Sequence, residues 1–230
     1  MIIGSGLLAA SFSSAYARSD EVLIYAAGVS NSACTDRHEF ERERALVVRT
    51  LREHPDIDTI VYFSTCSILD PDLQDTPYVL HKRAMEGLIS AHPGHLVLRL
   101  PQVAGRSNNP HTLLNYLFAK ISCSERFTIW GNASRNVIDV NDVLKVVRFI
   151  VDQRVIRQEI VNVANIVNYS VRDIVSTFER VCGKAASFDV IDKGRSFEID
   201  VSRIIPHLRP AEVRFDRAYL HDILQKYYGR

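Results

Sequence analysis

Long apolar runs and blocks of like charge are both missing from this sequence of 230 residues. No apolar stretch approaches the roughly 20 residues that a membrane-spanning helix needs. The 28 Lys and Arg residues against 27 Asp and Glu residues leave a net charge of +1, with no run of one sign. Neither nucleic acid nor an anionic membrane is therefore expected as a partner.

Patterns of metal-binding or disulfide-forming cysteines are missing as well. The chain has four cysteines, which lie far apart without a C-x-x-C pair: Cys34, Cys66, Cys123 and Cys182. None has a histidine at a spacing typical of zinc sites. We therefore expect no metal ligands and four reduced thiols, which favours a reducing compartment and a cytoplasmic location.

Apolar runs of strand length alternate with stretches of helix length. Strands are expected at residues 1–3, 22–26, 59–63, 95–100 and 160–164. Helices are expected at residues 7–17, 40–54, 77–92, 110–121, 142–153, 173–182 and 219–228. This alternation predicts an α/β fold, with a Rossmann-like, mainly parallel sheet flanked by helices and a small C-terminal substrate lobe. The character of the sequence changes after Gly105.

The first twenty residues fit two incompatible interpretations. An apolar run with serines, followed by Ala15-Tyr16-Ala17, looks like a signal peptide and its cleavage site. Gly4-Ser5-Gly6-Leu7-Leu8-Ala9 instead fits G-x-G-x-x-A between a strand and a helix, the pattern of a phosphate-binding loop. Because the first positive residue, Arg18, lies on the wrong side of the apolar run for a signal peptide, we expect the loop and no secretion.

In such a loop each position has a physical task. Gly4 permits the tight turn, Gly6 leaves space for a pyrophosphate, and the N-terminus of the following helix, at Leu7 and Leu8, supplies free N–H donors. An acidic residue at the end of the second strand usually binds the adenosine ribose. Here that strand ends in Ala26-Ala27-Gly28, so this determinant is missing.

Two stretches fit the pattern Y-x-x-x-K: Tyr78 with Lys82, and Tyr116 with Lys120. Residues four apart share a helix face, so an ammonium beside the phenol is expected to lower the tyrosine pKa toward the range of acid–base chemistry. Only Tyr78 has a hydroxyl residue, Thr65, upstream of it at the carboxyl end of a predicted strand. The carboxyl ends of parallel strands are where α/β sheets form their ligand-binding sites. We expect Tyr78, Lys82 and Thr65 to form the reactive set, and Tyr116 to pack within its helix.

These motifs, in this order, resemble the short-chain dehydrogenase/reductase superfamily, and within it the extended NAD-dependent epimerase/dehydratase branch that acts on nucleotide sugars. Arg99–Gly105 is similar to the strand end that holds the nicotinamide carboxamide in that family. Arg135–Asp142 is similar to its R-D-x-x-x-V-x-D segment, whose arginine contacts the nucleotide diphosphate. The resemblance implies NAD or NADP as cofactor and a nucleotide sugar as substrate. It also suggests a homodimer, which the sequence leaves open.

The resemblance assigns residues 1–105 to a truncated dinucleotide-binding domain. Residues 106–230 become mainly a substrate lobe, with one or more elements returning to the sheet. Tyr78 is the implied proton donor or acceptor at the sugar oxygen, Lys82 binds the nicotinamide ribose, and Thr65 orients the sugar. Arg135 and Asn109 are expected at the substrate. The residues implied in cofactor binding are Gly4, Gly6, Leu7, Leu8, Ala26, Ala27, Gly28, Ser64, Tyr78, Lys82, Pro101 and Val103.

Departures from the family narrow the chemistry. Members usually carry two strands between the first helix and the strand that starts here at Val22, so the adenosine side is trimmed. Thr65 is followed by Cys66 and Ser67, whereas the 4,6-dehydratases have Asp-Glu at these two positions. Members of the fucose-synthase type have a catalytic cysteine two residues after the Ser/Thr, at position 67, where this chain has Ser67. Dehydration and 3,5-epimerisation are therefore disfavoured. A 4-ketoreductase or a 4-epimerase, acting by hydride transfer at C4, remains.

Three further interpretations complete the expectations. The main alternative is a non-catalytic relative that binds a dinucleotide or a nucleotide sugar. A hydrolase with its nucleophile in Gly28-Val29-Ser30-Asn31-Ser32 is disfavoured, because G-x-S-x-G and a placed acid–base partner are missing. His81 is expected to face solvent or to support its neighbours, and Asn109 to cap the helix that follows it.

Overall fold

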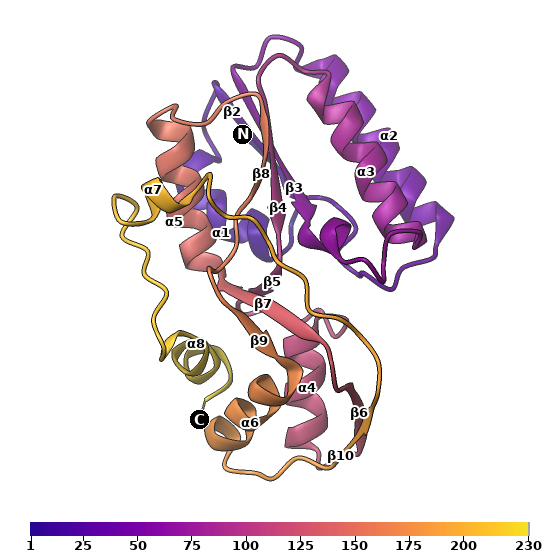
Figure 1. Ribbon diagram of the computed structural model, residues 1–230. Helices are drawn as coiled ribbons and strands as arrows, with labels where there is room; N and C mark the ends of the chain where they lie inside the picture. Colours follow the sequence, from indigo (N-terminus) through magenta and orange to yellow (C-terminus); the bar gives the residue numbers. More distant parts are fainter. Residues whose placement is uncertain (230) are drawn as a thin grey trace.

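The computed structural model describes residues 1–229 and has a five-stranded parallel sheet at its centre. The strand order is β1-β2-β3-β4-β8, and every neighbouring pair is parallel. Helices cover both faces of the sheet (Figure 1). The expected Rossmann-like α/β fold is therefore confirmed. The strands are β1 (Ile2–Ile3), β2 (Val22–Tyr25), β3 (Thr59–Thr65), β4 (His95–Leu100) and β8 (Glu159–Asn162).

Two pairs of helices make the outer layers. In Figure 1, α2 and α3 lie side by side against one face, and α1 and α5 lie against the other. The bounds are α1 (Leu7–Tyr16), α2 (Arg37–Glu53), α3 (Pro77–Ser90) and α5 (Val140–Asp152). No helix within residues 1–229 has the length and apolar character needed to cross a membrane.

Strand β2 shows why the sheet is covered on both faces. Val22 and Ile24 pack with the α1 and α5 side, whereas Leu23 and Tyr25 pack with the α2 and α3 side. Successive strand residues point to opposite faces, so a strand buried on both faces has a continuous apolar sequence. This is why β2, β3 and β4 are recognisable as strands in the sequence.

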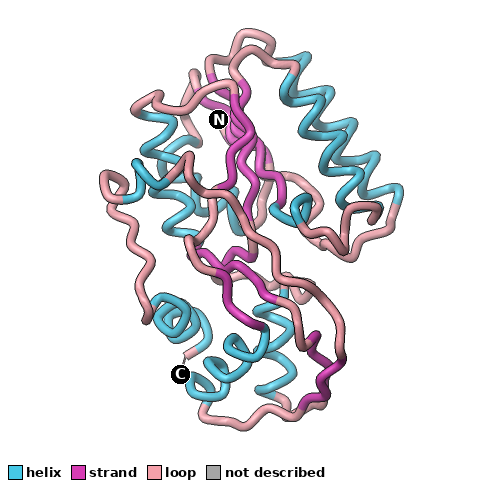
Figure 2. Tube along the Cα trace, in the orientation of Figure 1, coloured by secondary structure: helices cyan, strands magenta, loops and turns pink. Residues whose placement is uncertain are grey.

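Most of the remaining chain forms a lobe at the carboxyl ends of the strands (Figures 1 and 2), whereas the helix Ile205–Leu208 packs against α5 beside the sheet. β5-β7-β9 form a three-stranded sheet, β10 pairs with β6, and three helices share an apolar cluster with them. β8, from the second half of the chain, pairs with β4. The remaining elements are β5 (Gln102–Ala104), α4 (Leu113–Ser122), β6 (Phe127–Trp130), β7 (Ser134–Asp139), β9 (Asn168–Ser170), α6 (Val171–Cys182), β10 (Phe188–Ile191), α7 (Ile205–Leu208), α8 (Tyr219–Tyr228) and the short 3-10 helix Cys66–Leu69.

Helix α3 begins as the sequence indicates. Thr76 is its N-cap, its side chain accepts a hydrogen bond from the Val79 amide, and Pro77 occupies the first turn. Helix α4 is different: it begins at Leu113 after Thr112, not at Pro110. The expectation that Asn109 caps it is therefore wrong.

Gly4 makes the turn between β1 and α1 with a φ of +126°. A Cβ atom there would lie 2.3 Å from the Ala26 carbonyl oxygen, at the end of β2. The required backbone conformation and the close approach of β2 both exclude a side chain. Gly6 is the N-cap of α1 with a φ of −80°, and no atom lies within 4 Å of a Cβ added to it.

Alanine substitutions test the different conformational demands at Gly4 and Gly6. We expect Gly4→Ala to destabilise the protein by at least about 2 kcal/mol, because of its strained backbone and the clash with Ala26. Gly6→Ala is the matched control, with an expected change of less than about 1 kcal/mol. Urea denaturation of both variants measures this, and a Gly4→Ala variant as stable as the wild type would contradict the account of the turn.

Candidate active site

The structure brings Thr65 and Tyr78 together. Thr65 is the last residue of β3, and its hydroxyl accepts a hydrogen bond from the Ser67 amide at 3.1 Å. Tyr78 lies in the first turn of α3, and its hydroxyl is close enough to that of Thr65 for this neighbour to act on the pKa of Tyr78. Both side chains are buried. The two hydroxyls predicted to be reactive therefore meet at the carboxyl end of a central strand.

Lys82, one turn further along α3, is held by two buried groups. Its Nζ lies 3.0 Å from Oε1 of Glu43 and 3.0 Å from the hydroxyl of Tyr62. Only 2% of Lys82 is exposed. Burial lowers the pKa of Lys82, and the Glu43 carboxylate opposes this change.

Glu43, on α2, was not predicted from the sequence as a site residue, yet it collects four hydrogen-bond partners. Oε1 accepts from Tyr62 at 2.6 Å and from Lys82. Oε2 accepts from the Val29 amide at 2.7 Å and lies 3.0 Å from Nε2 of His81. Burial alone would raise the pKa of Glu43, but the bond from His81 and the charge of Lys82 outweigh it and lower the pKa to about 2. Glu43 is therefore a buried carboxylate whose charge is compensated locally.

The same network explains two neighbouring positions. His81 does not face solvent, because its side chain is 7% exposed and supports Glu43. A Cβ atom on Gly28 would lie 2.6 Å from Nζ of Lys82 and 2.9 Å from Oε1 of Glu43. Gly28 thus leaves room for this ion pair.

The pKa of Tyr78 moves opposite to the expectation from the sequence. Burial raises it above its ordinary value, the hydrogen bond with Thr65 counters part of the rise, and the charge of Glu43 adds to it. The expected lowering by Lys82 is therefore wrong in this structure. Burial of the Tyr78 hydroxyl is the main physical reason, and the charge of Glu43 adds to it.

Ser64 and Cys66 flank Thr65 and are engaged with the protein itself. The Ser64 hydroxyl donates to Oε1 of Glu86 at 2.6 Å, and the Arg99 guanidinium donates to both oxygens of Glu86 at 2.8 and 2.6 Å. The Cys66 thiol donates to the Arg99 carbonyl, and burial raises the pKa of Cys66 to about 12. Cys66 is thus an un-ionised thiol. The Ser64 hydroxyl joins β3 to α3, and the pair of Glu86 and Arg99 joins α3 to β4.

The N-terminus of α1 opens on a cavity of about 620 Å³ between the sheet and the lobe. Gly6 and Leu7 line it from α1, and Arg106 and Lys226 line it from the lobe. Lys226 also pairs with Asp139 at 2.6 Å. Free N–H groups, the space above Gly6 and two cations suit a pyrophosphate. Arg106 and Lys226 were missed in the sequence, because neither belongs to a motif.

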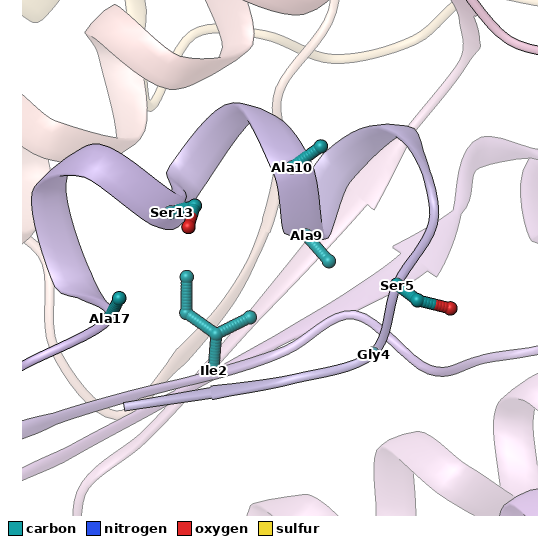
Figure 3. Close-up of a pocket in the computed structure, with 7 residues that line it drawn as sticks. All are labelled: Ile2, Gly4, Ser5, Ala9, Ala10, Ser13 and Ala17. Carbon is teal, nitrogen blue, oxygen red and sulfur yellow. The ribbon is translucent and has the colours of Figure 1, made fainter.

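The groove along α1 and the edge strand β1 has a small, uncharged lining. A second cavity, of about 330 Å³, lies beside α1 and β1 (Figure 3). Within residues 1–229, β1 is the edge strand of its sheet, with only β2 as a neighbour. The lining residues are Ile2, Gly4, Ser5, Ala9, Ala10, Ser13 and Ala17.

The other predicted cofactor residues are distributed around the loop. Gly4 lies against Ala26 and Ala27 at the end of β2. Leu7 packs against Gly105, just after β5. Leu8 and Val103 pack against the apolar cluster on the α1 and α5 side. Pro101 lies between β4 and β5.

Arg135 and Asn109 lie on the lobe side. Arg135, on β7, donates to the Ser134 carbonyl at 2.7 Å; burial lowers its pKa, while Asp70 and Asp72, in the loop after Thr65, oppose this change. The guanidinium is therefore close enough to that loop to sense its charge. The amide of Asn109 donates to the Ser30 hydroxyl at 3.1 Å, which links the lobe to the loop after β2.

The Glu43 carboxylate predicts an acid-dependent loss of stability. Its folded-state pKa of about 2 lies below the ordinary value of 4.5, so its contribution is fully present above about pH 4.5 and is lost as the pH falls through about 2. Between about pH 5.5 and about pH 3, protonation of Glu43 should lower the unfolding free energy of the wild type by roughly 2 kcal/mol. E43Q has no carboxyl group at this position, so its unfolding free energy should lack this decrease.

Urea denaturation across this pH range measures the difference. Glu41→Gln is the matched control, because Glu41 lies on the same helix with a side chain 69% exposed. It should follow the wild type. Equal pH slopes for the wild type and E43Q would contradict the lowered pKa of Glu43.

Comparisons with solved structures show the same fold. UDP-glucuronic acid 4-epimerase from Bacillus cereus, in complex with UDP-glucuronic acid and NAD, is similar with a TM-score of 0.75 and 19% identity over 90% of this chain and 74% of that chain. UDP-glucose 4-epimerase from Thermus thermophilus, complexed with NAD, is similar with a TM-score of 0.72 and 16% identity over 89% of this chain and 77% of that chain. RMD from Pseudomonas aeruginosa, complexed with NADPH, is similar with a TM-score of 0.72 and 14% identity over 99% of each chain.

Sequence comparisons complete the assignment. A search of curated proteins finds no match. The model of the NAD dependent epimerase/dehydratase family matches residues 7–164, which is more than half of the chain. The phosphate loop from Leu7 onward, the Thr65–Tyr78 pair and Lys82 all fall within this match. The chain belongs to the NAD-dependent epimerase/dehydratase family.

Proposed function

We propose that the protein is an NAD(P)-dependent enzyme that transfers a hydride at C4 of a nucleotide-linked sugar, as a 4-ketoreductase or a 4-epimerase. The observation that carries the proposal is the buried, neighbouring pair of Thr65 and Tyr78 hydroxyls at the carboxyl end of β3. Two of the similar structures described above are 4-epimerases in complex with NAD. Another, MoeE5, is in complex with UDP-glucose and NAD.

The cavity at α1 supplies the groups that a dinucleotide requires. The N–H groups after Gly6, together with Arg106 and Lys226, would hold the pyrophosphate. Lys82 would face the nicotinamide ribose. When bound, the nicotinamide supplies or accepts the hydride.

The protein's own residues hold the proton and the sugar. The Tyr78 hydroxyl gives a proton to the sugar oxygen or takes one from it, and the Thr65 hydroxyl orients that oxygen. Arg135 would contact the nucleotide diphosphate from the lobe. Asp70 and Asp72 lie close enough to act on the positive charge of Arg135. An incoming diphosphate would therefore compete with these two carboxylates for the Arg135 guanidinium.

A second candidate is a non-catalytic relative that binds a dinucleotide or a nucleotide sugar. The small, uncharged adenosine side favours it, because part of the usual binding energy for a dinucleotide is missing. Cofactor titration separates the candidates: no measurable affinity for NADH or NADPH would favour the binding module.

Tyr78→Phe tests the proposed proton transfer. Turnover of a nucleotide sugar identified as a substrate should fall by about 100-fold or more, because the variant has no hydroxyl to move the proton. NADH or NADPH affinity, measured by cofactor fluorescence, should fall by no more than about tenfold, since the variant loses at most one hydrogen bond to the cofactor, worth about 1 kcal/mol. Tyr116→Phe is the control, because Tyr116 also precedes a lysine by four residues but lies on α4 in the lobe. Unchanged turnover in Tyr78→Phe would contradict the mechanism.

The adenosine side makes a second prediction. No carboxylate is placed there to select the ribose hydroxyl of NADH, and no arginine to select the extra phosphate of NADPH. We expect the dissociation constants for NADH and NADPH to differ by less than about tenfold. Fluorescence titration with both cofactors measures the ratio. A preference above about 100-fold for either cofactor would require a selective group that this region does not show.

A further inference from the structure

Helix α8 joins the core of the lobe to the cavity at the N-terminus of α1. Its apolar face belongs to the cluster that fills the lobe, where it packs beside α6 (Figure 1). Near its end, Lys226 and Tyr227 line the cavity of about 620 Å³. The match to the family model ends at residue 164, so both side chains come from a part of the chain beyond that match.

Asp139, the N-cap of α5, binds both of these side chains. Nζ of Lys226 donates to Oδ2 of Asp139 at 2.6 Å, and the Tyr227 hydroxyl donates to Oδ1 at 2.7 Å. Oδ1 also accepts from the Asn141 amide at 2.8 Å. Only 6% of Asp139 is exposed, so these partners fix the orientation of its carboxylate. Lys226 and the N-terminus of α5 together offset its charge.

Lys226 keeps donors for a second partner. An ammonium has three N–H groups, and the bond to Asp139 occupies one of them. The ammonium also lies 4.8 Å from the centre of the Tyr227 ring, while its side chain is 44% exposed at the cavity. The remaining N–H groups can therefore donate to phosphate oxygens in the cavity while the bond to Asp139 stays in place.

Helix α8 also supports the opposite wall of the cavity. The Tyr228 hydroxyl donates to Oδ1 of Asn115 on α4 at 2.7 Å. The amide of Asn115 donates in turn to the carbonyls of Ser107 at 2.9 Å and Asn109 at 2.7 Å. Arg106, which lines the cavity, directly precedes this tethered segment. One helix thus supports both segments that bring a cation to the cavity.

We propose that α8 is one wall of the cofactor site, in which Lys226 binds the pyrophosphate of NAD or NADP while Asp139 and Tyr227 are positioning residues that hold its ammonium toward the cavity. Cofactor binding and the docking of α8 on α5 are then coupled, because one ammonium takes part in both. This inference rests on the proposed function and extends the cofactor site to the C-terminal helix.

Fluorescence titration of the full chain with NADH tests the role of Lys226. K226M should bind NADH about tenfold more weakly or worse, because it keeps the aliphatic stem but has no charged donor for the phosphates. K226R should bind within about threefold of the wild type, since a guanidinium also donates to phosphate. Lys145→Met is the matched control, because Lys145 lies on α5, pairs with Asp142 and has a side chain 47% exposed. It should match the wild type.

The positioning roles are tested by combining variants. Y227F and D139N should each weaken NADH binding by about threefold or more, because the ammonium of Lys226 loses its fixed place. In a K226M background the same substitutions should weaken binding no further, since they act through Lys226. A merely structural role of Tyr227 or Asp139 would give effects that add to that of K226M.

Hydrogen exchange of the α8 backbone amides tests the coupling, with each protein compared free and saturated with NADH. In the wild type, NADH should slow the exchange of α8 at least about threefold more than that of α6. Helix α6 is the internal reference, because it packs beside α8 and supplies none of the described residues that line the cavity. In K226M the difference between the two helices should be lost.

Four results would overturn the inference and leave the proposed function standing. These are equal NADH binding by the wild type and K226M, additive effects in the combined variants, tighter binding by D139N, and exchange of α8 that NADH does not slow beyond that of α6. Tighter binding by D139N would show that Asp139 competes with the cofactor for Lys226. Failure of the wild type to bind either NADH or NADPH would contradict the proposed function, and this inference with it.

Discussion

The buried carboxylate of Glu43 is the interaction on which the site depends. It joins α2 to α3 through Lys82 and His81, to β3 through Tyr62, and to the loop after β2 through the Val29 amide. A buried charge is tolerated only when partners replace its lost hydration, and here every partner comes from a segment that borders the site. The same contacts that stabilise the layer of α2 and α3 also place Lys82.

The opposite layer has a different task. Gly4 allows β1 to pass close to β2, and Gly6 leaves the N-terminus of α1 open toward Arg106 and Lys226. The N-terminus of α1 therefore opens on a cavity lined by two basic side chains, while the cavity beside the edge strand β1 has a small, uncharged lining. In the proposed function the first would hold the pyrophosphate of the dinucleotide.

Sequence reasoning recovered the features that are local in the chain. The strands β2, β3 and β4 are continuous apolar runs because both of their faces are buried, and Thr76 and Pro77 mark the start of α3. The lobe strands β7 and β9 were not predicted, because polar residues such as Arg135, Asn136 and Asn168 leave them without such runs. Glu43 was missed because it lies 39 residues from Lys82, on a helix whose mixed charges look like a solvated surface.

The most direct test of the central claim is the thermal stability of the purified protein with NADH or NADPH and a panel of UDP-, GDP- and dTDP-sugars. A ligand that binds only the folded state raises the melting temperature as its concentration exceeds the dissociation constant. The account predicts a rise with either cofactor, and a further rise with one class of nucleotide sugar. No shift with either cofactor at saturating concentration would contradict it.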